Sequence, residues 1–326
     1  MPESLTIRPY QLLCAVCRVG ADAVTPADDR IAEFLAAVRE RPDLPVTLQC
    51  NAGDVYLYQD PGTAEDSPEG AEFNLKRDLD ILQRLDLPPG STLPARTLLL
   101  RVLSRIASVA GICGYETVTS DAWRGCAKWQ CGAYEQGRER GIEAFIPPRD
   151  AAEMVCDKAS SVGAIRNAEC LTIRPHVLMC CVCCHGQTDG SGEPLAQDNI
   201  VEFIEETRRR PEVPIKFVRG ADWMVCAPCP ARVADINACV NVAGSGGLSN
   251  EKRDIDLLQK LGLTYGSALP AREMLRLLFE LVPTTVDICR RDNIAPSVWW
   301  DGCGEANMTQ GNPGYEKGRE MLMGEW

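Results

Sequence analysis

The feature that most constrains this chain is an internal repetition. Three stretches recur in the same order: LTIRPYQLLCAVCRVG (5–20) as LTIRPHVLMCCVCCHG (171–186), KRDLDILQRLDL (76–87) as KRDIDLLQKLGL (252–263), and GSTLPARTLLLRVL (90–103) as GSALPAREMLRLLF (266–279). Farther along, YEQGRE (134–139) returns as YEKGRE (315–320). A repeat of this length is too long for a solenoid unit and predicts two tandem domains.

We place the first repeat at residues 1–148, a linker at 149–169 and the second repeat at 170–326. The linker predicts a connecting helix, because Asp150 can cap the run of helix-forming residues that follows it. Related surfaces of a fused duplicate can meet as two subunits would. We therefore expect the repeats to pack as an internal pseudo-dimer.

Each repeat predicts an α+β fold that is mostly helical and has one small β-hairpin. Apolar residues at helical spacing follow Pro9, and a second helix is expected from about Thr25 to Arg41. The hairpin strands are expected in PVTLQC and VYLY around NAGD, and in PIKFV and WMVC around RGAD. Later helices are expected at about 74–86, 94–108, 250–261 and 270–282.

Composition argues against several classes of protein. The formal net charge of −12 is shared equally, because residues 1–166 hold 18 Lys/Arg against 24 Asp/Glu and the remainder holds 16 against 22. Neither half is a basic nucleic-acid module. No apolar run approaches the roughly 18 residues that span a bilayer, and the N-terminus has no signal-peptide pattern. We expect neither a membrane nor a nucleic-acid partner.

The chain has 17 cysteines, an odd number without a secretion signal. This favours metal ligation or buried thiols in a reducing cytoplasm over a disulfide framework. The spacing C-x2-C-P-x8-C of Cys226, Cys229 and Cys239 occurs only in the second repeat, as do the two histidines, His176 and His185. The second repeat is therefore expected to carry the chemistry.

Helical geometry suggests how a metal site could form. On a helix over 175–184, His176, Cys180 and Cys183 share one face, while Cys181 points away from it. Two thiolates in the proline-stiffened turn of Cys226 and Cys229 converge readily on a metal. Cys239 and Cys180 would complete a four-thiolate shell. His176 is a ligand, a hydrogen-bond donor to the site or a core residue in this interpretation.

These residues resemble a small bacterial and archaeal family of unknown function that is presumed to bind iron and sulfur. Its pattern is R-P-H-H-L-L-C, then C-x-x-C-P, then C, and the second repeat has IRPHVLMC, MVCAPCP and a further cysteine. The resemblance covers most of the family's length and implies four cluster ligands, with His176 near them: Cys180, Cys226, Cys229 and Cys239. Val177 stands where the family has its second histidine.

The first repeat lacks these groups, since Tyr10, Tyr58 and Pro61 stand at the corresponding places. The resemblance implies a degenerate copy that kept the fold and lost this cofactor. Thiolates suit both Zn²⁺ and iron–sulfur clusters. The proline after Cys229 is typical of ferredoxin-like ligand turns and, with the resemblance, favours a cluster with a redox or electron-transfer role. The redox or protein partner is not identified by the sequence.

Two alternatives are a zinc-stabilised interaction domain and a metal-dependent enzyme with a pocket between the repeats, so enzymatic activity is left open. A second set of thiols also recurs, as Cys14, Cys17, Cys113 and Cys126 and as Cys180, Cys183, Cys289 and Cys303. Neither 113–126 nor 289–303 contains a tight C-x-x-C pair. We interpret this second set as buried structural thiols.

Overall fold

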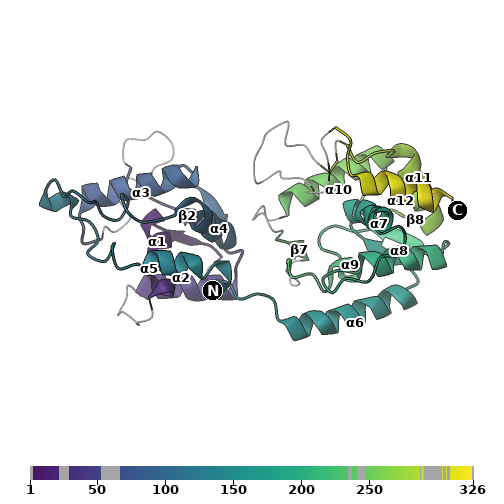
Figure 1. Ribbon diagram of the computed structural model, residues 1–326, viewed down its shortest axis with the longest axis horizontal. Coiled ribbons are helices and arrows are strands. Elements are labelled where there is room, and N and C mark those ends of the chain that lie inside the picture. Colours follow the sequence, from purple (N-terminus) through teal and green to yellow (C-terminus); the bar gives the residue numbers. More distant parts are fainter. Residues whose placement is uncertain are drawn as a thin grey trace. The chain divides into compact units, whose positions relative to one another are not determined.

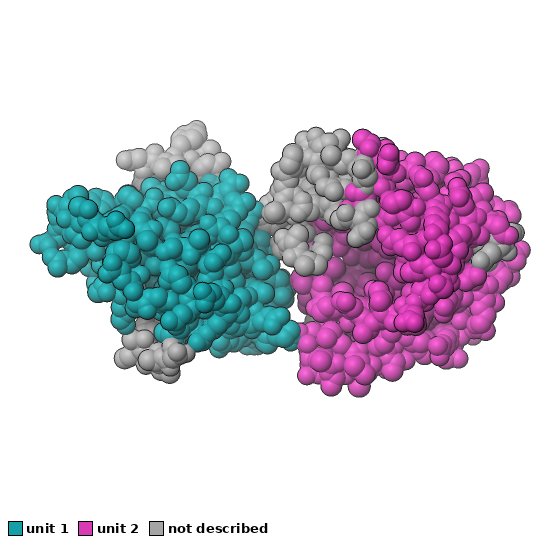
Figure 2. Space-filling view, viewed as in Figure 1, with its two compact units in different colours: residues 1–148 teal, residues 149–326 magenta. Residues whose placement is uncertain are grey.

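The computed structural model describes residues 3–21, 29–52, 67–233, 237–240, 247–286, 288–289, 303, 306 and 309–324. Contacts divide the chain into two compact units, unit 1 (1–148) and unit 2 (149–326), which Figure 2 colours separately. Both units combine α-helices with short β-strands (Figure 1). In the described part of the chain, no helix has the length and apolar character needed to cross a bilayer.

The described residues of unit 1 form five α-helices and a three-stranded sheet. The strands pair in the order β1-β2-β3, with β1 and β2 parallel and β2 and β3 antiparallel. The elements are β1 (Leu5–Ile7), α1 (Pro9–Gly20), α2 (Asp29–Glu40), β2 (Pro45–Leu48), α3 (Ala71–Leu85), β3 (Thr92–Pro94), α4 (Ala95–Arg105), η1 (Asp121–Trp123), α5 (Ala133–Glu139) and η2 (Ile142–Ala144).

Unit 2 has a sheet of the same order and sense, β4-β5-β8, together with a two-stranded sheet of β6 and β7. Its elements are α6 (Ala151–Asn167), β4 (Leu171–Ile173), α7 (Pro175–Gln187), α8 (Ile200–Arg209), β5 (Pro214–Phe217), α9 (Trp223–Cys226), β6 (Arg232–Val233), β7 (Ala238–Cys239), α10 (Leu248–Leu261), β8 (Ala268–Pro270), α11 (Ala271–Leu281) and α12 (Pro313–Met323). The helices predicted after Pro9, near 74–86 and 94–108, and near 250–261 and 270–282 are confirmed as α1, α3, α4, α10 and α11.

In each unit, an arginine just before a helix that begins with proline, α1 or α7, forms a buried ion pair across the core. The Nε atom of Arg8 lies 2.5 Å from Asp78 on α3, and an NH2 atom of Arg174 lies 2.6 Å from Asp254 on α10. The next residue, Pro9 or Pro175, opens the helix, where a missing N–H costs nothing. These pairs fix the N-terminal ends of α1 and α7 against the helix opposite.

Glycine lets two helices cross with their backbones in contact. A Cβ atom added to Gly20 of α1 would overlap the carbonyl oxygen of Ala133 in α5, and one added to Gly137 would overlap that of Val16. The same relation holds in unit 2, where a Cβ atom on Gly318 of α12 would overlap the carbonyl oxygen of Val182. The cores of both units lie around these crossings.

The connecting helix is confirmed as α6. The side chain of Asp150 accepts a hydrogen bond from the backbone N–H of Glu153, 2.8 Å away, as an N-cap does. This helix lies alongside α8 and α9 (Figure 1) and belongs to unit 2. Asn199, at the start of α8, donates from its side chain to Ser161 of α6 at 2.7 Å.

The hairpin prediction is wrong in unit 2. PIKF forms β5, but it pairs with β4 and β8. WMVC forms the short helix α9 because the side chain of Asp222 caps it, accepting the backbone N–H of Val225 at 3.1 Å. In unit 1, β2 likewise pairs with β1 and β3, while the strand expected at 55–58 and the helix start near Thr25 lie outside the described residues.

Candidate metal centre

Three of the predicted ligands lie on consecutive turns that fold back on one another. Cys226 is the last residue of α9, and the backbone N–H of Cys229 donates to its carbonyl oxygen at 3.0 Å. The backbone N–H of Arg232 in turn donates to Cys229 at 3.1 Å. The β6–β7 pairing then places Cys239 directly opposite Arg232. This small hairpin, which sequence reasoning missed, returns the third cysteine to the turn.

The three thiols share one electrostatic environment. Burial raises the pKa of Cys226, and the charges of Asp222, Cys229 and Cys239 raise it further. Burial also raises the pKa of Cys229, with Cys239 adding to the effect. Cys226 and Cys229 are therefore protonated at neutral pH, and a metal bound there must displace their protons.

Two residues that sequence reasoning missed hold this cysteine-bearing turn. The guanidinium group of Arg149 donates to the backbone carbonyls of Ala227, at 2.5 Å, and Cys229, at 3.1 Å. The side-chain amide of Asn250 on α10 lies 3.7 Å from the sulfur of Cys239. No local sequence pattern predicts either contact. Arg149 is 78 residues from Ala227, and Asn250 is 11 residues from Cys239.

His176 lies in a buried network beside the turn. Its ring Nδ1 is 2.7 Å from an oxygen of Asp254, and burial lowers the pKa of His176 although Asp254 opposes this. The ring is therefore neutral, so Nδ1 donates to Asp254 and Nε2 keeps a lone pair. A carboxylate that orients a histidine in this way is common where the ring binds a metal.

Arg174 brings a positive charge to the same place. Its side chain is 5% exposed and pairs with Asp254. Burial alone would lower the pKa of Arg174, but Asp254 and the nearby Cys226 and Cys239 outweigh it, and the pKa is raised. The cation is thus paired with a carboxylate and lies within electrostatic range of two of the candidate ligands.

Cys180, the fourth predicted ligand, is grouped with other thiols. Burial, and then the neighbouring Cys289, raises the pKa of Cys180 to about 12, and Cys303 contributes as well. Burial and then Cys180, Cys289 and Cys303 likewise raise the pKa of Cys183. The structure therefore brings Cys180 together with the second set of thiols.

The donor groups fit a thiolate-bound cofactor but do not converge on one point. In the described part of the chain, no three side chains of His, Cys, Asp or Glu are placed so that they could hold a single metal ion. Cys226 ends α9, Cys229 and Cys239 follow it, and Arg174 and His176 lie at the start of α7. In a four-iron cluster each of the four thiolates binds a different iron, so the ligands surround a volume.

Unit 1 has a different side chain where unit 2 has His176. Tyr10 keeps the backbone contact, since its N–H donates to Asp78 at 3.0 Å. Its ring packs under the guanidinium group of Arg77, whose central carbon lies 4.1 Å from the ring centre. Tyr58 and Pro61 lie outside the described residues.

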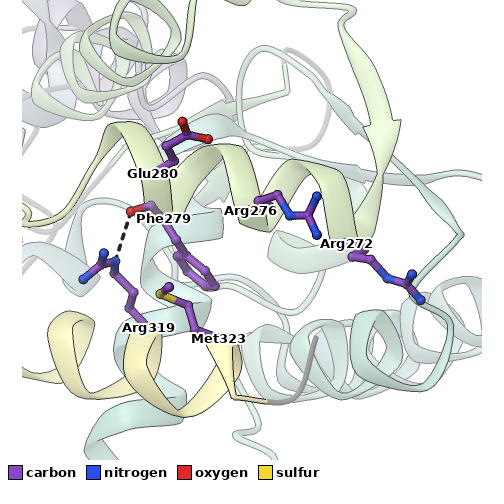
Figure 3. Close-up of a pocket in the computed structure, with 6 residues that line it drawn as sticks. All are labelled: Arg272, Arg276, Phe279, Glu280, Arg319 and Met323. Atoms are coloured by element: carbon purple, nitrogen blue, oxygen red, sulfur yellow. Dashed lines mark hydrogen bonds between the residues drawn. The ribbon is translucent and has the colours of Figure 1, made fainter.

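A separate pocket of about 310 Å³ opens between α11 and α12 (Figure 3). Two of its arginines have structural partners: Arg319 donates to the carbonyl of Phe279 at 3.0 Å, and Arg272 pairs with Glu212 at 3.0 Å. The lining residues are Arg272, Arg276, Phe279, Glu280, Arg319 and Met323. The described lining residues include no Cys, Ser, Thr or His, and we assign no chemistry to this pocket.

No protein-family model, curated protein or solved structure matches this chain. The resemblance to the presumed iron–sulfur family therefore rests on the motif residues alone.

Proposed function

We propose that unit 2 carries an iron–sulfur cluster bound through Cys226, Cys229 and Cys239, with a fourth ligand from α7, and that the protein has a redox or electron-transfer role. The observation that carries this proposal is the buried guanidinium of Arg174 beside Cys226 and Cys239. Buried charges require compensation, and a cluster held by thiolates is an anion.

The charge balance at this site favours an anionic cofactor. Both carboxylate oxygens of Asp254 already accept hydrogen bonds, from Arg174 and from His176, at 2.6 to 3.0 Å. With protonated thiols the site is close to neutral, and deprotonation of the thiols on metal binding would bring their negative charge next to Arg174. That cation would stabilise the bound state over the metal-free state and influence the reduction potential of a cluster.

Two side chains on α7 are candidates for the fourth ligand. Cys180 is the residue that the motif implies, and a thiolate would complete the four-cysteine set. His176 has a neutral ring with its Nδ1 proton directed at Asp254, which leaves Nε2 as a donor to iron. Histidine replaces cysteine as a ligand in some iron–sulfur proteins.

We propose further that the units arose by tandem duplication, with unit 1 as a copy that lost the hairpin cysteines. Three matched features support this: the strand order, the Arg8–Asp78 and Arg174–Asp254 pairs, and the glycine crossings. Each joins segments that the internal sequence repeats relate.

The full chain, purified without oxygen, tests the cofactor through its visible absorption and its iron, sulfide and zinc content. Thiol alkylation read by mass spectrometry locates it, since Cys226, Cys229 and Cys239 should be protected when the metal is bound. Cys229→Ser should release Cys226 and Cys239 for alkylation, and Cys181→Ser should leave both protected. The reverse pattern would refute the site.

The fourth ligand is identified by two further variants. If Cys180 binds the cluster, Cys180→Ser removes the unit 2 metal, and His176→Ala retains it with a shifted reduction potential. If His176 binds, the outcomes are exchanged.

Zinc is the second candidate, favoured by the C-x-x-C turn that runs directly into a two-stranded hairpin bearing Cys239. Structural zinc sites commonly pair such a turn with a nearby strand. Zinc without sulfide or visible absorption, with the same cysteines protected, would support an interaction domain and exclude the redox role.

A further inference from the structure

Five cysteines of unit 1 line a single cavity of about 290 Å³. Two come from α1, and three come from the segment between α4 and α5. They are Cys14, Cys17, Cys113, Cys126 and Cys131. The cavity therefore brings together thiols from α1 and from the segment before α5, which lie far apart in the sequence.

Backbone geometry fixes where these thiols stand. Cys14 and Cys17 are three residues apart on α1 and so share a face of the helix. The backbone N–H of Cys126 donates to the carbonyl oxygen of Cys113 at 2.8 Å, which ties together two cysteines from one long loop. The backbone N–H of Cys113 itself donates to Val109 at 2.9 Å. The four positions are held by hydrogen bonds of the main chain.

Cations line the cavity along with the thiols, namely Arg18, Arg77 and Lys128. Its other walls are mainly apolar, with Leu13, Ile31 and Val109 among them. A cavity with several thiols, positive charges and an apolar lining suits an anionic, sulfur-rich ligand. Packing alone would not require cations beside the thiols.

Burial dominates the environment of two of these thiols, Cys17 and Cys113. Burial, and then the neighbouring Cys14, raises the pKa of Cys17 well above its ordinary range. Burial raises the pKa of Cys113 to about 12, although Arg77 opposes this.

We infer that this cavity of unit 1 binds an iron–sulfur cluster through Cys14, Cys17, Cys113 and Cys126. A single ion would need the sulfurs to meet at one point, and no three such side chains in the described residues do so. A cluster instead occupies a volume whose corners each bind one thiolate. Cys131, which is exposed, is a neighbouring thiol at the rim.

The corresponding thiols of unit 2 keep the same internal bond. There the backbone N–H of Cys303 donates to the carbonyl oxygen of Cys289, also at 2.8 Å, and Cys180 and Cys183 stand beside them. This second occurrence shows that the arrangement in unit 1 is a feature of the fold. The inference for unit 1 is independent of the hairpin site, because it uses other residues in another unit.

Cluster uptake from a preformed donor requires no oxidant or reductant. A synthetic cluster bearing four small-molecule thiolates exchanges them for the four cysteines. Each cysteine loses its S–H proton and forms an Fe–S bond, and each departing thiolate takes one proton and leaves as a thiol. Iron and sulfide keep their oxidation states throughout.

The test uses the full reduced chain, with and without this preformed cluster, and reads alkylation of every cysteine by mass spectrometry. Labelling of Cys14, Cys17, Cys113 and Cys126 should be lost on cluster addition and return when a chelator removes the iron. Cys156, exposed on α6, should be labelled in both states. Equal labelling of Cys14 and Cys113 in the two states would overturn the inference.

A double variant measures how much iron and sulfide the cavity of unit 1 holds. Cys113→Ser with Cys126→Ser should lower iron and sulfide by the content of one cluster and leave the protection of Cys226 and Cys229 unchanged. Cys50→Ser is the matched control, because Cys50 is buried in unit 1 and is not among the residues that line the cavity. Protection of the four thiols by zinc without sulfide would replace the cluster by a zinc site. The wild-type labelling decides the matter even where the variant fails to fold.

Discussion

His176 and Asp254 are joined by two hydrogen bonds to one carboxylate oxygen: the ring Nδ1 lies 2.7 Å from it, and the backbone N–H of His176 donates to it at 3.0 Å. The other carboxylate oxygen accepts from Arg174 at 2.6 Å. Asp254 therefore positions both the imidazole and the guanidinium that border the candidate metal centre. Its loss should be felt first in the stability of unit 2.

We predict that Asp254→Ala lowers the free energy of unfolding of unit 2 by about 3–5 kcal/mol, because it leaves the buried Arg174 without its counter-charge. Hydrogen exchange of peptides from α7 and α10 measures this loss within the full chain. Arg272→Ala is the control, since its pair with Glu212 is exposed and its removal should cost about 1 kcal/mol or less. Similar losses in both variants would contradict the prediction.

The pKa values of the two buried aspartates, Asp78 and Asp254, should be shifted in opposite directions. Burial raises the pKa of Asp78 from 3.8 to about 6, although Arg8 opposes it. Burial would also raise the pKa of Asp254, but His176 and Arg174 outweigh it and the pKa is lowered. Carboxyl-carbon chemical shifts of labelled aspartate should separate the two residues, and a common midpoint near 4 would contradict the assignment.

The shift of Asp78 fixes the sign of a pH effect on unit 1. Its folded pKa lies above the ordinary value, so the folded unit binds this proton more tightly than the unfolded chain does. The resulting stabilisation is complete below about 3.8 and is lost as the pH rises through about 6. We predict that hydrogen-exchange protection of α3, corrected for intrinsic rates, falls across this interval in the wild type and stays flat in Asp78→Asn.

Alanine at the helix crossings should be destabilising. In Gly137→Ala and Gly318→Ala the new methyl group would overlap a carbonyl oxygen of the facing helix, which costs about 1–3 kcal/mol. Gly163→Ala on α6 meets nothing within 4 Å and should stabilise its helix by about 0.5–1 kcal/mol. Thermal unfolding of the three variants measures the contrast, and a neutral Gly137→Ala would mean that α1 and α5 can separate without loss.

Arg149 should control the order of the cysteine-bearing turn. Arg149→Ala removes the donor to the carbonyls of Ala227 and Cys229, so the peptide bonds from 226 to 233 should exchange hydrogen and be cut by protease faster. Retention of a metal bound at Cys229 should weaken in the same variant. Arg166→Ala, at an exposed position on α6, the helix that follows Arg149, should change neither property.

Helices were predictable from this sequence, and strand pairing was not. Apolar spacing, Pro9 and the Asp150 cap all act within a few residues, so α1 and α6 could be placed from local chemistry. The partner of β5 is chosen by β4 and β8, which lie far away in the chain. WMVC has strand-like composition, and only the capping bond from Asp222 decides for a helix.

The candidate site was predictable in part for the same reason. The C-x-x-C spacing pointed to Cys226 and Cys229, and the copy-specific pattern added Cys239. The grouping of Cys180 with Cys289 depends on how the last segment of unit 2 packs against α7, which no spacing reveals. The predicted role of Cys180 as a ligand stays a prediction, and so does the packing of the two units as a pseudo-dimer.

The position of Arg149 redefines where the second unit begins. A chain shortened to start at residue 170 would keep Cys226, Cys229 and Cys239 but would lack the guanidinium that holds their turn and the helix that lies against α8 and α9. Such a fragment would fail for a reason unrelated to its sulfur chemistry. Residues 149–169, which the sequence suggests are a linker, therefore help to hold the second unit together. Any fragment of the second unit should begin before Arg149.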